Sequence, residues 1–162
     1  MIQQPSLVFR PALESDILGM QVVRNAVTEN RLSDPSVIQD SDYLPFIDSR
    51  GRGWVCTAND TVVGFAFVDA VNRNVWALFV HPEFENMGIG KTLHQLMLDW
   101  YFFNHTGTLW LSTAPQTRAE RFYELLGWER TGIHGKEIKF ELSVENWNAT
   151  RNRVRPDLPN GD

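Results

Sequence analysis

The sequence predicts an α/β (α+β) fold built on a mixed sheet, and three observations predict it. First, three apolar runs between residues 54 and 80 are joined by short polar turns, which is typical of an antiparallel meander. Second, the last run feeds a glycine turn and an amphipathic helix over residues 78–100. Third, a further strand and helix follow, so a strand–helix–strand unit continues the meander. This order gives a mixed sheet rather than the regular alternation of a doubly wound fold.

Composition places the chain among ordinary globular domains. Its 162 residues, 43% hydrophobic and 22% charged, suffice for one domain with a full core. We expect a cytoplasmic protein without a membrane partner, because no apolar run approaches the roughly 20 residues that span a bilayer and the first residues lack a secretion-signal pattern. The net charge of −5 argues against a nucleic-acid partner. The single Cys56 excludes an internal disulfide framework, and its apolar surroundings favour core packing over a nucleophile.

The first third of the chain alternates short elements with polar breaks. We expect a strand over residues 7–10 and a helix over residues 15–27, followed by an irregular segment over residues 30–35. A short helix over residues 41–47 and a loop over residues 49–53 come next. Ser15 or Asp16 can cap the first helix, and Asp34 with Pro35 offers a second cap and a first-turn proline. The irregular segment is as compatible with a flap over the surface as with a scaffold element.

The remaining elements are more regular. They are three meander strands over residues 54–58, 62–68 and 75–80, followed by a long helix that Thr106 and Gly107 stop. A strand, a helix and a closing strand pair come next, over residues 108–113, 118–126, 128–132 and 136–142. Asn59–Asp60 is a tight hairpin signal, and Gly127 can end the second helix. We expect Trp54, Trp76, Trp110 and Trp128 to be core residues, and Ala119, Phe122 and Leu126 to face inward. The predicted organisation is one domain over residues 1–145 and a polar tail over residues 146–162 that is either loose or docked on a partner.

The stretch over residues 78–100 is the centre of the functional argument. On its helix the apolar positions form one stripe: Ile89, Leu93, Leu96, Met97 and Trp100. The glycine turn that opens this helix presents backbone N–H groups at a positive dipole end, where phosphate can bind. A Walker A loop would require glycine at position 85, which is Glu, and a dinucleotide fingerprint would require glycine at position 93, which is Leu. A packed helix start without a ligand stays open as the alternative.

Two blocks of sequence carry a family resemblance. Glu85-Asn86-Met87-Gly88-Ile89-Gly90, after Leu78-Phe79-Val80-His81-Pro82, resembles the acetyl-CoA-binding motif Gln/Arg-x-x-Gly-x-Gly/Ala of the GNAT superfamily of N-acetyltransferases. Residues 112–128 resemble the later Asn-x-x-Ala-x-x-Phe-Tyr helix of that family. Phe9-Arg10-Pro11-Ala12 with Asp16 is similar to its first strand and helix. The resemblance covers roughly residues 7–142 and implies a GNAT-like, mostly antiparallel sheet of six to seven strands flanked by about four helices.

The resemblance also implies an activity and a set of site residues. The activity is direct transfer of an acetyl group from acetyl-CoA, as cosubstrate, to a primary amine of a small molecule or peptide, and a homodimer is a state known in the family. The residues implied to bind the cofactor are Leu78, Phe79, Val80, Met87, Gly88, Ile89, Gly90, Lys91, Thr92 and Gln116. Tyr123 is implied to protonate the departing thiolate. No metal ligand is assigned. Glu85 and Gln116 depart from the residues usual at their positions.

Several alternatives stay open at this point. The expected strand carboxylate that would serve as general base is missing, and His81, Glu83, Glu29 and Asp42 are the nearest candidates. A non-catalytic acyl-CoA-binding sensor or interaction module is the second function, and a nucleotide-binding domain is the third. Tyr123 can also be a core residue. An aromatic acceptor site from Tyr43, Phe46 and Trp76 is a further hypothesis.

Overall fold

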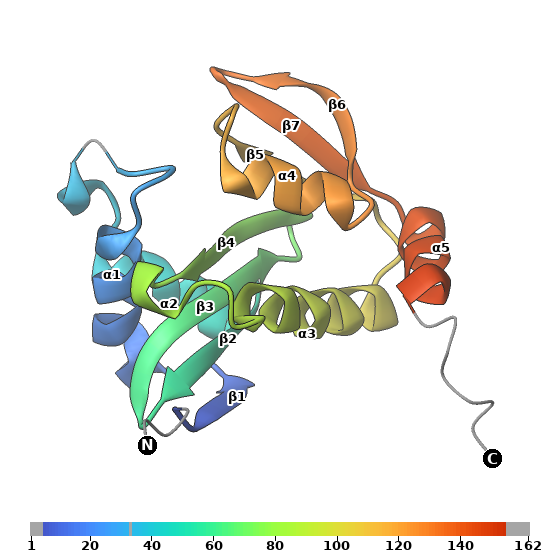
Figure 1. Ribbon diagram of the computed structural model, residues 1–162. Coiled ribbons are helices and arrows are strands. Elements are labelled where there is room, and N and C mark those ends of the chain that lie inside the picture. Colours follow the sequence, from blue (N-terminus) through green and yellow to red (C-terminus); the bar gives the residue numbers. More distant parts are fainter. Residues whose placement is uncertain (1–4, 33, 155–162) are drawn as a thin grey trace, which may run out of the picture. The chain divides into compact units, whose positions relative to one another are not determined.

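A computed structural model describes residues 5–32 and 34–154 (Figure 1). The chain divides into two compact units between Asn104 and His105. The described residues form seven strands, β1 (Leu7–Pro11), β2 (Gly51–Ala58), β3 (Thr61–Asp69), β4 (Asn74–Val80), β5 (Leu109–Thr113), β6 (Glu129–His134) and β7 (Glu137–Leu142). They also form five α-helices, α1 (Ile17–Ala26), α2 (Asp40–Asp48), α3 (Ile89–Asn104), α4 (Arg118–Leu125) and α5 (Val144–Val154). In the part of the chain that the structure describes, no helix is both long enough and apolar enough to cross a membrane.

The first unit is an antiparallel meander in which each strand, from β1 to β4, pairs with the next. Asn59 and Asp60 both have positive φ, 49° and 69°, as the predicted two-residue hairpin turn requires. The predicted loop over residues 49–53 is wrong in its second half, since β2 already begins at Gly51. There Gly53 pairs with Phe67, and a Cβ at Gly53 would meet the Phe67 ring. The aromatic side chain of one strand therefore occupies the space that a side chain on the other would need.

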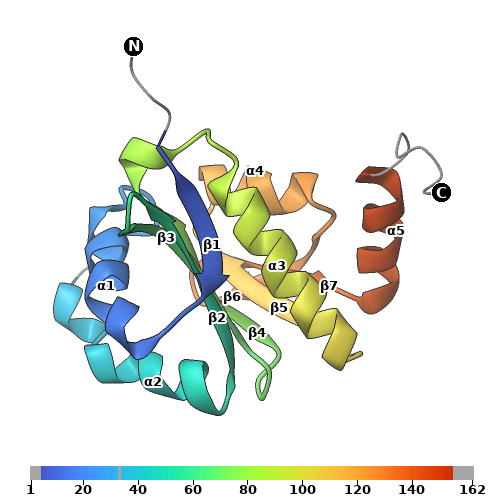
Figure 2. The ribbon, with the colours of Figure 1, turned by 90° about the horizontal axis from the view of Figure 1, so that it is seen from below.

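Helices α1 and α2 cover one face of this meander and α3 covers the other (Figure 2). The core on the α1 and α2 side consists of Ala12, Ile17, Met20, Val23, Tyr43, Phe46, Val55, Phe65, Phe67 and Ala77. On the opposite face a Cβ at Gly64 would lie 3.0 Å from Ile89 Cγ2 and 3.3 Å from a Leu93 methyl. Glycine at this position therefore lets the first turns of α3 lie directly on β3. Cys56 is fully buried, as predicted, and burial raises its pKa to about 11.

An irregularity in β4 brings Trp76 into the aromatic core. The β3–β4 register shifts between Phe67 and Val68, so Trp76 is the extra residue of a bulge. Its ring stacks on Phe46 with centroids 4.3 Å apart and meets Tyr43 edge-on at 5.2 Å. The core prediction therefore holds for Trp54, which is buried, whereas Trp76 is only half-buried.

The entry to α1 is fixed by an ion pair. Arg10 at the end of β1 donates from Nη1 and Nη2 to the two Asp16 carboxylate oxygens, at 2.7 and 2.8 Å. The same carboxylate accepts the Leu13 backbone N–H at 2.8 Å. These hydrogen bonds hold the pKa of the buried Asp16 below its usual range. Asp16 therefore stands at the N-cap position of α1, but its carboxylate bonds the Leu13 N–H and Arg10 rather than an N–H of α1, and so ties the helical segment to β1.

The second unit contains an antiparallel sheet in the order β5-β7-β6. Its face toward α4 carries Phe140, whose ring lies 6.3 Å from that of Tyr123. The inward stripe predicted for α4 is shifted by one position, since Ala119, Phe122 and Leu126 are half-buried and Tyr123 is buried. Trp110 is half-buried on the other face of this sheet, with the Lys139 ammonium 5.5 Å from its centroid. The core prediction is therefore wrong for Trp110 and correct for the buried Trp128.

The segment after β7 differs from the predicted loose tail. Residues 144–154 form α5, and Trp147 on this helix is buried. A Cβ at Gly127, where φ is +94°, would meet the Thr150 hydroxyl, so the turn that ends α4 lies close against α5. The expectation of a loose tail is therefore wrong for residues 146–154, while residues 155–162 lie outside the described residues. The boundary proposed at residue 145 stays a prediction.

Candidate functional site

The end of β4 directs alternate backbone groups to opposite sides. The His81 N–H donates to the Val63 carbonyl at 2.8 Å, so residues 81, 79 and 77 hydrogen-bond to β3 in the alternation of an antiparallel ladder. The N–H and C=O groups of Leu78 and Val80 consequently point to the side of β4 away from β3. Of Phe79 and Val80, both among the implied cofactor residues, only Val80 turns its N–H to this outer side.

His81 begins a short 3-10 helix over Pro82–Phe84. Its Nδ1 accepts the Glu83 backbone N–H at 3.1 Å and so caps that helix. Because a nitrogen that accepts an N–H bond carries no proton, the neutral ring holds its proton on Nε2. In this tautomer Nε2 has no lone pair for a proton from substrate. The capping contact therefore disfavours His81 as a general base.

The glycine turn before α3 contains two residues with left-handed backbone, separated by Met87. Asn86 has φ of 65° and Gly88 has φ of 80°, a region that glycine adopts without strain. The Thr92 N–H donates to the Gly88 carbonyl at 3.0 Å, the first bond of the helix. The N–H groups of Ile89, Gly90 and Lys91 precede that bond and, by helix geometry, have no partner four residues back. Three N–H dipoles thus point out of the positive end of a 16-residue helix.

The surroundings of this turn suit an anion. Met87, Gly88, Lys91 and Thr92 are exposed, and a Cβ at Gly88 would meet no atom within 4 Å. Glu85 is exposed as well, so its charge is screened by solvent. Behind the turn, Ile89, Leu93 and Met97 are fully buried, whereas Leu96 and Trp100 of the predicted stripe are half-buried. The first turn of α3 is therefore held by buried apolar side chains on one side, while its other side is exposed to solvent.

Buried polar residues on α3 belong to the core rather than to this turn. His94 is buried, and desolvation lowers its pKa to about 3, so its ring is neutral at physiological pH. In the described residues no group of three or more His, Cys, Asp or Glu side chains could hold a metal ion.

In the second unit the main candidate is Tyr123 on α4. Its ring packs edge-on against Trp128 at 5.6 Å, and its carbonyl accepts the Trp128 N–H at 3.0 Å. Burial raises the pKa of the phenol well above its ordinary value near 10, so the hydroxyl stays protonated at neutral pH. This state is required of a proton donor, and it is equally compatible with a core tyrosine.

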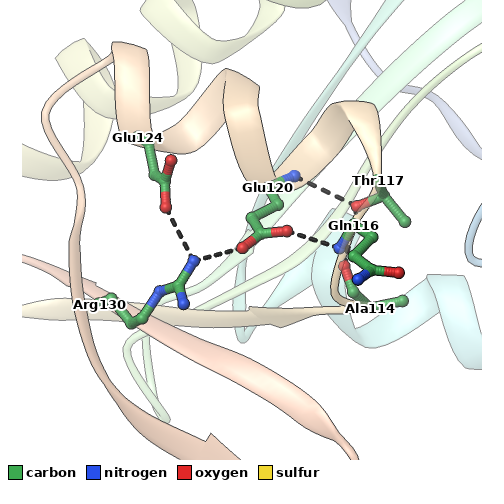
Figure 3. A network of polar contacts seen from close by, with 6 residues as sticks. All are labelled: Ala114, Gln116, Thr117, Glu120, Glu124 and Arg130. Atoms are coloured by element: carbon green, nitrogen blue, oxygen red, sulfur yellow. Dashed lines mark hydrogen bonds and ion pairs between the residues drawn. The ribbon is translucent and has the colours of Figure 1, made fainter.

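The turn before α4 is held by a network of polar contacts (Figure 3). Gln116, the predicted cofactor contact, has φ of 63° and an exposed side chain. Its N–H donates to Glu120 Oε2 at 2.6 Å. Thr117 Oγ1 donates to the Ala114 carbonyl at 2.8 Å and accepts the Glu120 N–H at 3.2 Å. The sequence analysis did not single out Glu120, although the Thr117-x-x-Glu120 spacing is the signal of a helix capping box.

The remaining candidates are occupied by structural contacts or are solvated. Asp42 accepts the Gln39 N–H at 2.7 Å and caps α2. Glu29 and Glu83 are exposed. Tyr43 is almost fully buried, donates to Gln21 Oε1 at 3.0 Å and has a pKa raised to about 12 by burial. The hypothetical aromatic acceptor group of Tyr43, Phe46 and Trp76 does come together, but mainly as core packing.

Comparison with known proteins gives a consistent result. A model of the acetyltransferase (GNAT) family matches residues 20–128, which is more than half of the chain. No curated protein sequence matches the chain. Among similar solved structures, the ribosomal-protein-S18-alanine N-acetyltransferase of Escherichia coli is 18% identical, with a TM-score of 0.70 over 86% of this chain and 94% of that chain.

Two further structures extend the comparison. The PaiA N-acetyltransferase of Thermoplasma acidophilum, in complex with coenzyme A, is 15% identical with a TM-score of 0.68, over 85% of this chain and 99% of that chain. A GNAT-family acetyltransferase of Staphylococcus aureus Mu50 is 14% identical, with a TM-score of 0.74 over 86% of this chain and 99% of that chain. At these identities the likeness establishes a shared fold. The predicted α/β, mostly antiparallel fold class is confirmed.

Proposed function

This chain belongs to the acetyltransferase (GNAT) family, and we propose that it moves an acetyl group from acetyl-CoA to a primary amine of a small molecule or peptide by direct transfer. The observation that carries the proposal is the glycine turn, where the first three N–H groups of α3 lie ahead of the first helical bond and a Cβ at Gly88 would meet no atom. A solved relative in fold is described as a complex with coenzyme A, which supports a CoA thioester as the donor.

The cofactor assignments follow the backbone geometry. Residues 87–92 of the glycine turn would hold the pyrophosphate through their N–H groups, with the glycines allowing close approach. The outward N–H and C=O groups of Leu78 and Val80 would pair with the amides of the pantetheine arm, as a peptide adds to a strand. The Val80 N–H would polarise the thioester carbonyl. Gln116 would contribute a side-chain amide to the cofactor.

The reaction requires no enzyme nucleophile. The neutral amine attacks the thioester carbonyl, a C–N bond forms, and the C–S bond breaks as the electron pair moves to sulfur. The ammonium group of the adduct loses its proton to water, because the candidate side-chain bases are capped or solvated. Tyr123 would donate its hydroxyl hydrogen bond to the departing sulfur. Since the pKa of the phenol lies above that of a thiol, about 8.5, this bond stabilises the developing thiolate more than it transfers a proton outright.

The test is to mix the protein with acetyl-CoA and a panel of amines and to follow free thiol. Release above background with at least one amine supports the transferase, and no release with any amine, despite CoA binding, would contradict it. Tyr123→Phe should lower kcat by about tenfold to a hundredfold with little change in acetyl-CoA affinity, since it removes only the hydroxyl. Equal loss of turnover and affinity would make Tyr123 a structural residue.

The pH profile gives an independent check on Tyr123. A phenol whose pKa is raised above 10 keeps its proton throughout the range from pH 7 to 10. If Tyr123 is the donor, kcat should not fall on the alkaline side of that range. A fall there that persists in Tyr123→Phe would assign the titration to another group.

A second candidate function is an acyl-CoA-binding sensor or interaction module without turnover. The absence of a carboxylate from the sequence of β4 and the presence of Glu85 favour it. Calorimetry distinguishes the two, because a sensor would bind acetyl-CoA and release no thiol. Competition of ATP or GTP with CoA would instead point to a nucleotide-binding domain. A cytoplasmic location and a homodimer stay predictions.

A further inference from the structure

Glu120 makes an unusual contact for its position in a helix. In a standard capping box the acidic side chain of the third helical residue bonds the backbone N–H of the cap residue, here Thr117. Instead, the Glu120 carboxylate bonds the N–H of Gln116, one residue earlier, at 2.6 Å. Thr117 still completes its half of the box by accepting the Glu120 N–H. The shifted bond therefore reaches outside the helix and fixes the turn that precedes it (Figure 3).

Glu120 bonds a residue, Gln116, whose backbone conformation is unfavourable by itself. Gln116 has φ of 63°, a left-handed conformation that costs a non-glycine residue free energy and that Asn tolerates better than Gln. A charge-assisted hydrogen bond to its N–H offsets that cost and stabilises this one conformation. Because the side chain leaves the same backbone, the bond also fixes the direction of the Cα–Cβ bond from which the exposed Gln116 side chain extends.

Arg130 on β6 orients the carboxylate. Its Nη2 pairs with Glu120 Oε1, while Glu120 Oε2 bonds the Gln116 N–H. The same nitrogen pairs with Glu124 Oε1 at 2.9 Å. Glu120 is 14% exposed and Glu124 is 48% exposed, so the two carboxylates share a partner but differ in shielding from solvent and in contact with the turn. This difference provides a matched control within one helix.

We propose that Glu120, oriented by Arg130, is a positioning residue that locks the left-handed turn at Gln116 and so presents the Gln116 amide to the CoA cofactor. The inference rests on the proposed function, which supplies the cofactor. It assigns Glu120 no contact with substrate. It also separates the two roles on α4, because Tyr123 is held independently by its packing against Trp128 and Phe140 and by the backbone bond from Trp128.

The experiment compares Glu120→Ala with Glu124→Ala in steady-state kinetics. Glu120→Ala should raise KM for acetyl-CoA and the Kd for CoA by about fivefold, with kcat within about twofold of the parent, because a hydrogen bond to a charged group is lost at the turn and not at Tyr123. Glu124→Ala should leave KM, Kd and kcat within about twofold, since it keeps the bond to Gln116. An equal rise in KM in both variants, or a fall in kcat with KM unchanged, would overturn the proposal.

A rescue tests whether the turn conformation is the cause. Adding Gln116→Asn to Glu120→Ala should recover most of the lost affinity, because Asn keeps the amide and adopts the left-handed region more readily. A merely structural role for Glu120 would not be repaired by this change. No recovery, at unchanged thermal stability, would therefore contradict the proposal.

A substitute variant covers the case in which Glu120→Ala does not fold, and a separate criterion distinguishes failure of the positioning role from failure of the proposed function. If Glu120→Ala does not fold, Arg130→Ala replaces it and should raise KM by about twofold relative to Glu124→Ala, since it only frees the carboxylate to move. If Arg130→Ala matches Glu124→Ala, the proposal is wrong. The proposed function is judged on the unaltered protein alone: no thiol release there rejects the transferase, whereas release with indistinguishable Glu120 and Glu124 variants rejects only the positioning role.

Discussion

Helices α3 and α4 each follow a strand through a turn that contains a left-handed residue, yet their first turns are completed in different ways. Before α3 the left-handed position nearest the helix is Gly88, which has no side chain to cap the helix. Before α4 the left-handed residue is Gln116. Thr117, which follows it, accepts a first-turn N–H with its hydroxyl, and the Glu120 carboxylate accepts the Gln116 N–H. At the start of α3 the left-handed glycine supplies no side-chain cap, whereas at the start of α4 the Thr117 hydroxyl accepts one first-turn N–H and Glu120 fixes the turn before the helix.

The difference separates two uses of the same backbone geometry. A positive helix end attracts whichever negative group can reach it. At the start of α4 the Glu120 carboxylate, a negative group of the chain itself, bonds the N–H of Gln116 in the turn before the helix. At α3 the nearest acidic residue, Glu85, is exposed and precedes the turn. We therefore expect substitutions at the start of α3 to change cofactor affinity more than substitutions at the start of α4, and loss of the Thr117 cap to act mainly on stability.

The largest expected effect comes from placing a side chain at the start of α3. Gly88→Val should weaken CoA binding by at least about tenfold, because its Cβ would stand in the open space before the N–H groups and because a β-branched residue disfavours φ of 80°. Isothermal calorimetry with CoA measures the affinity. The free energy of unfolding should fall by only about 1–3 kcal/mol, since the added Cβ meets no protein atom.

Gly132→Ala is the matched control for that variant. Gly132 also has no atom within 4 Å of a built Cβ, but it lies on the exposed strand β6 and not at a helix start. Its CoA affinity should equal that of the parent. Comparable losses of CoA affinity in the two variants would mean that the affinity responds to a general loss of stability and not to the glycine turn.

An intermediate effect is expected at the start of α4. Thr117→Ala should lower the free energy of unfolding by about 1 kcal/mol, since it removes the cap of α4 and leaves the Glu120 N–H without its acceptor. Chemical denaturation measures this change, and Thr117→Ser should restore most of it. A loss of CoA affinity larger than that of Gly88→Val would reverse the comparison between the two helices.

The smallest effect is expected at Glu85. Glu85→Gln should strengthen CoA binding by about twofold at low salt, because it removes a negative charge near the proposed pyrophosphate position. The gain should disappear at high salt, since the side chain is exposed and screened. Titrations at two ionic strengths measure it. A gain that survives high salt would show that Glu85 acts through a direct contact.

The sequence predicted best those features that depend on local backbone chemistry. The Asn59–Asp60 turn, the start of α3 after Gly88 and the α4 helix to within one residue all follow from turn and capping residues, whose conformational preferences act within a few positions. The resemblance named the family, which the family model confirms. The cofactor and catalytic residues stay predictions.

The features missed from sequence depend on distant partners. Gly51 and Gly53 carry no strand signal, and they are strand residues because β3 pairs with them and Phe67 covers Gly53. Helix α5 is polar along most of its length and is anchored by Trp147, which is buried. The predicted inward face of α4 was wrong by one position, because Phe122 and Tyr123 are adjacent and both bulky, so that the sequence does not tell which of them is buried. Only the sheet beneath the helix decides which of them is buried.

The placement of Cys56 has a practical consequence for every measurement proposed above. It is the only cysteine of the chain, it is fully buried in β2, and its raised pKa leaves almost no thiolate at neutral pH. A thiol-specific dye therefore reacts with released CoA and not with the folded enzyme. Any rapid reaction before substrate is added would count unfolded molecules, so each variant reports its folded fraction in the same cuvette that measures its turnover.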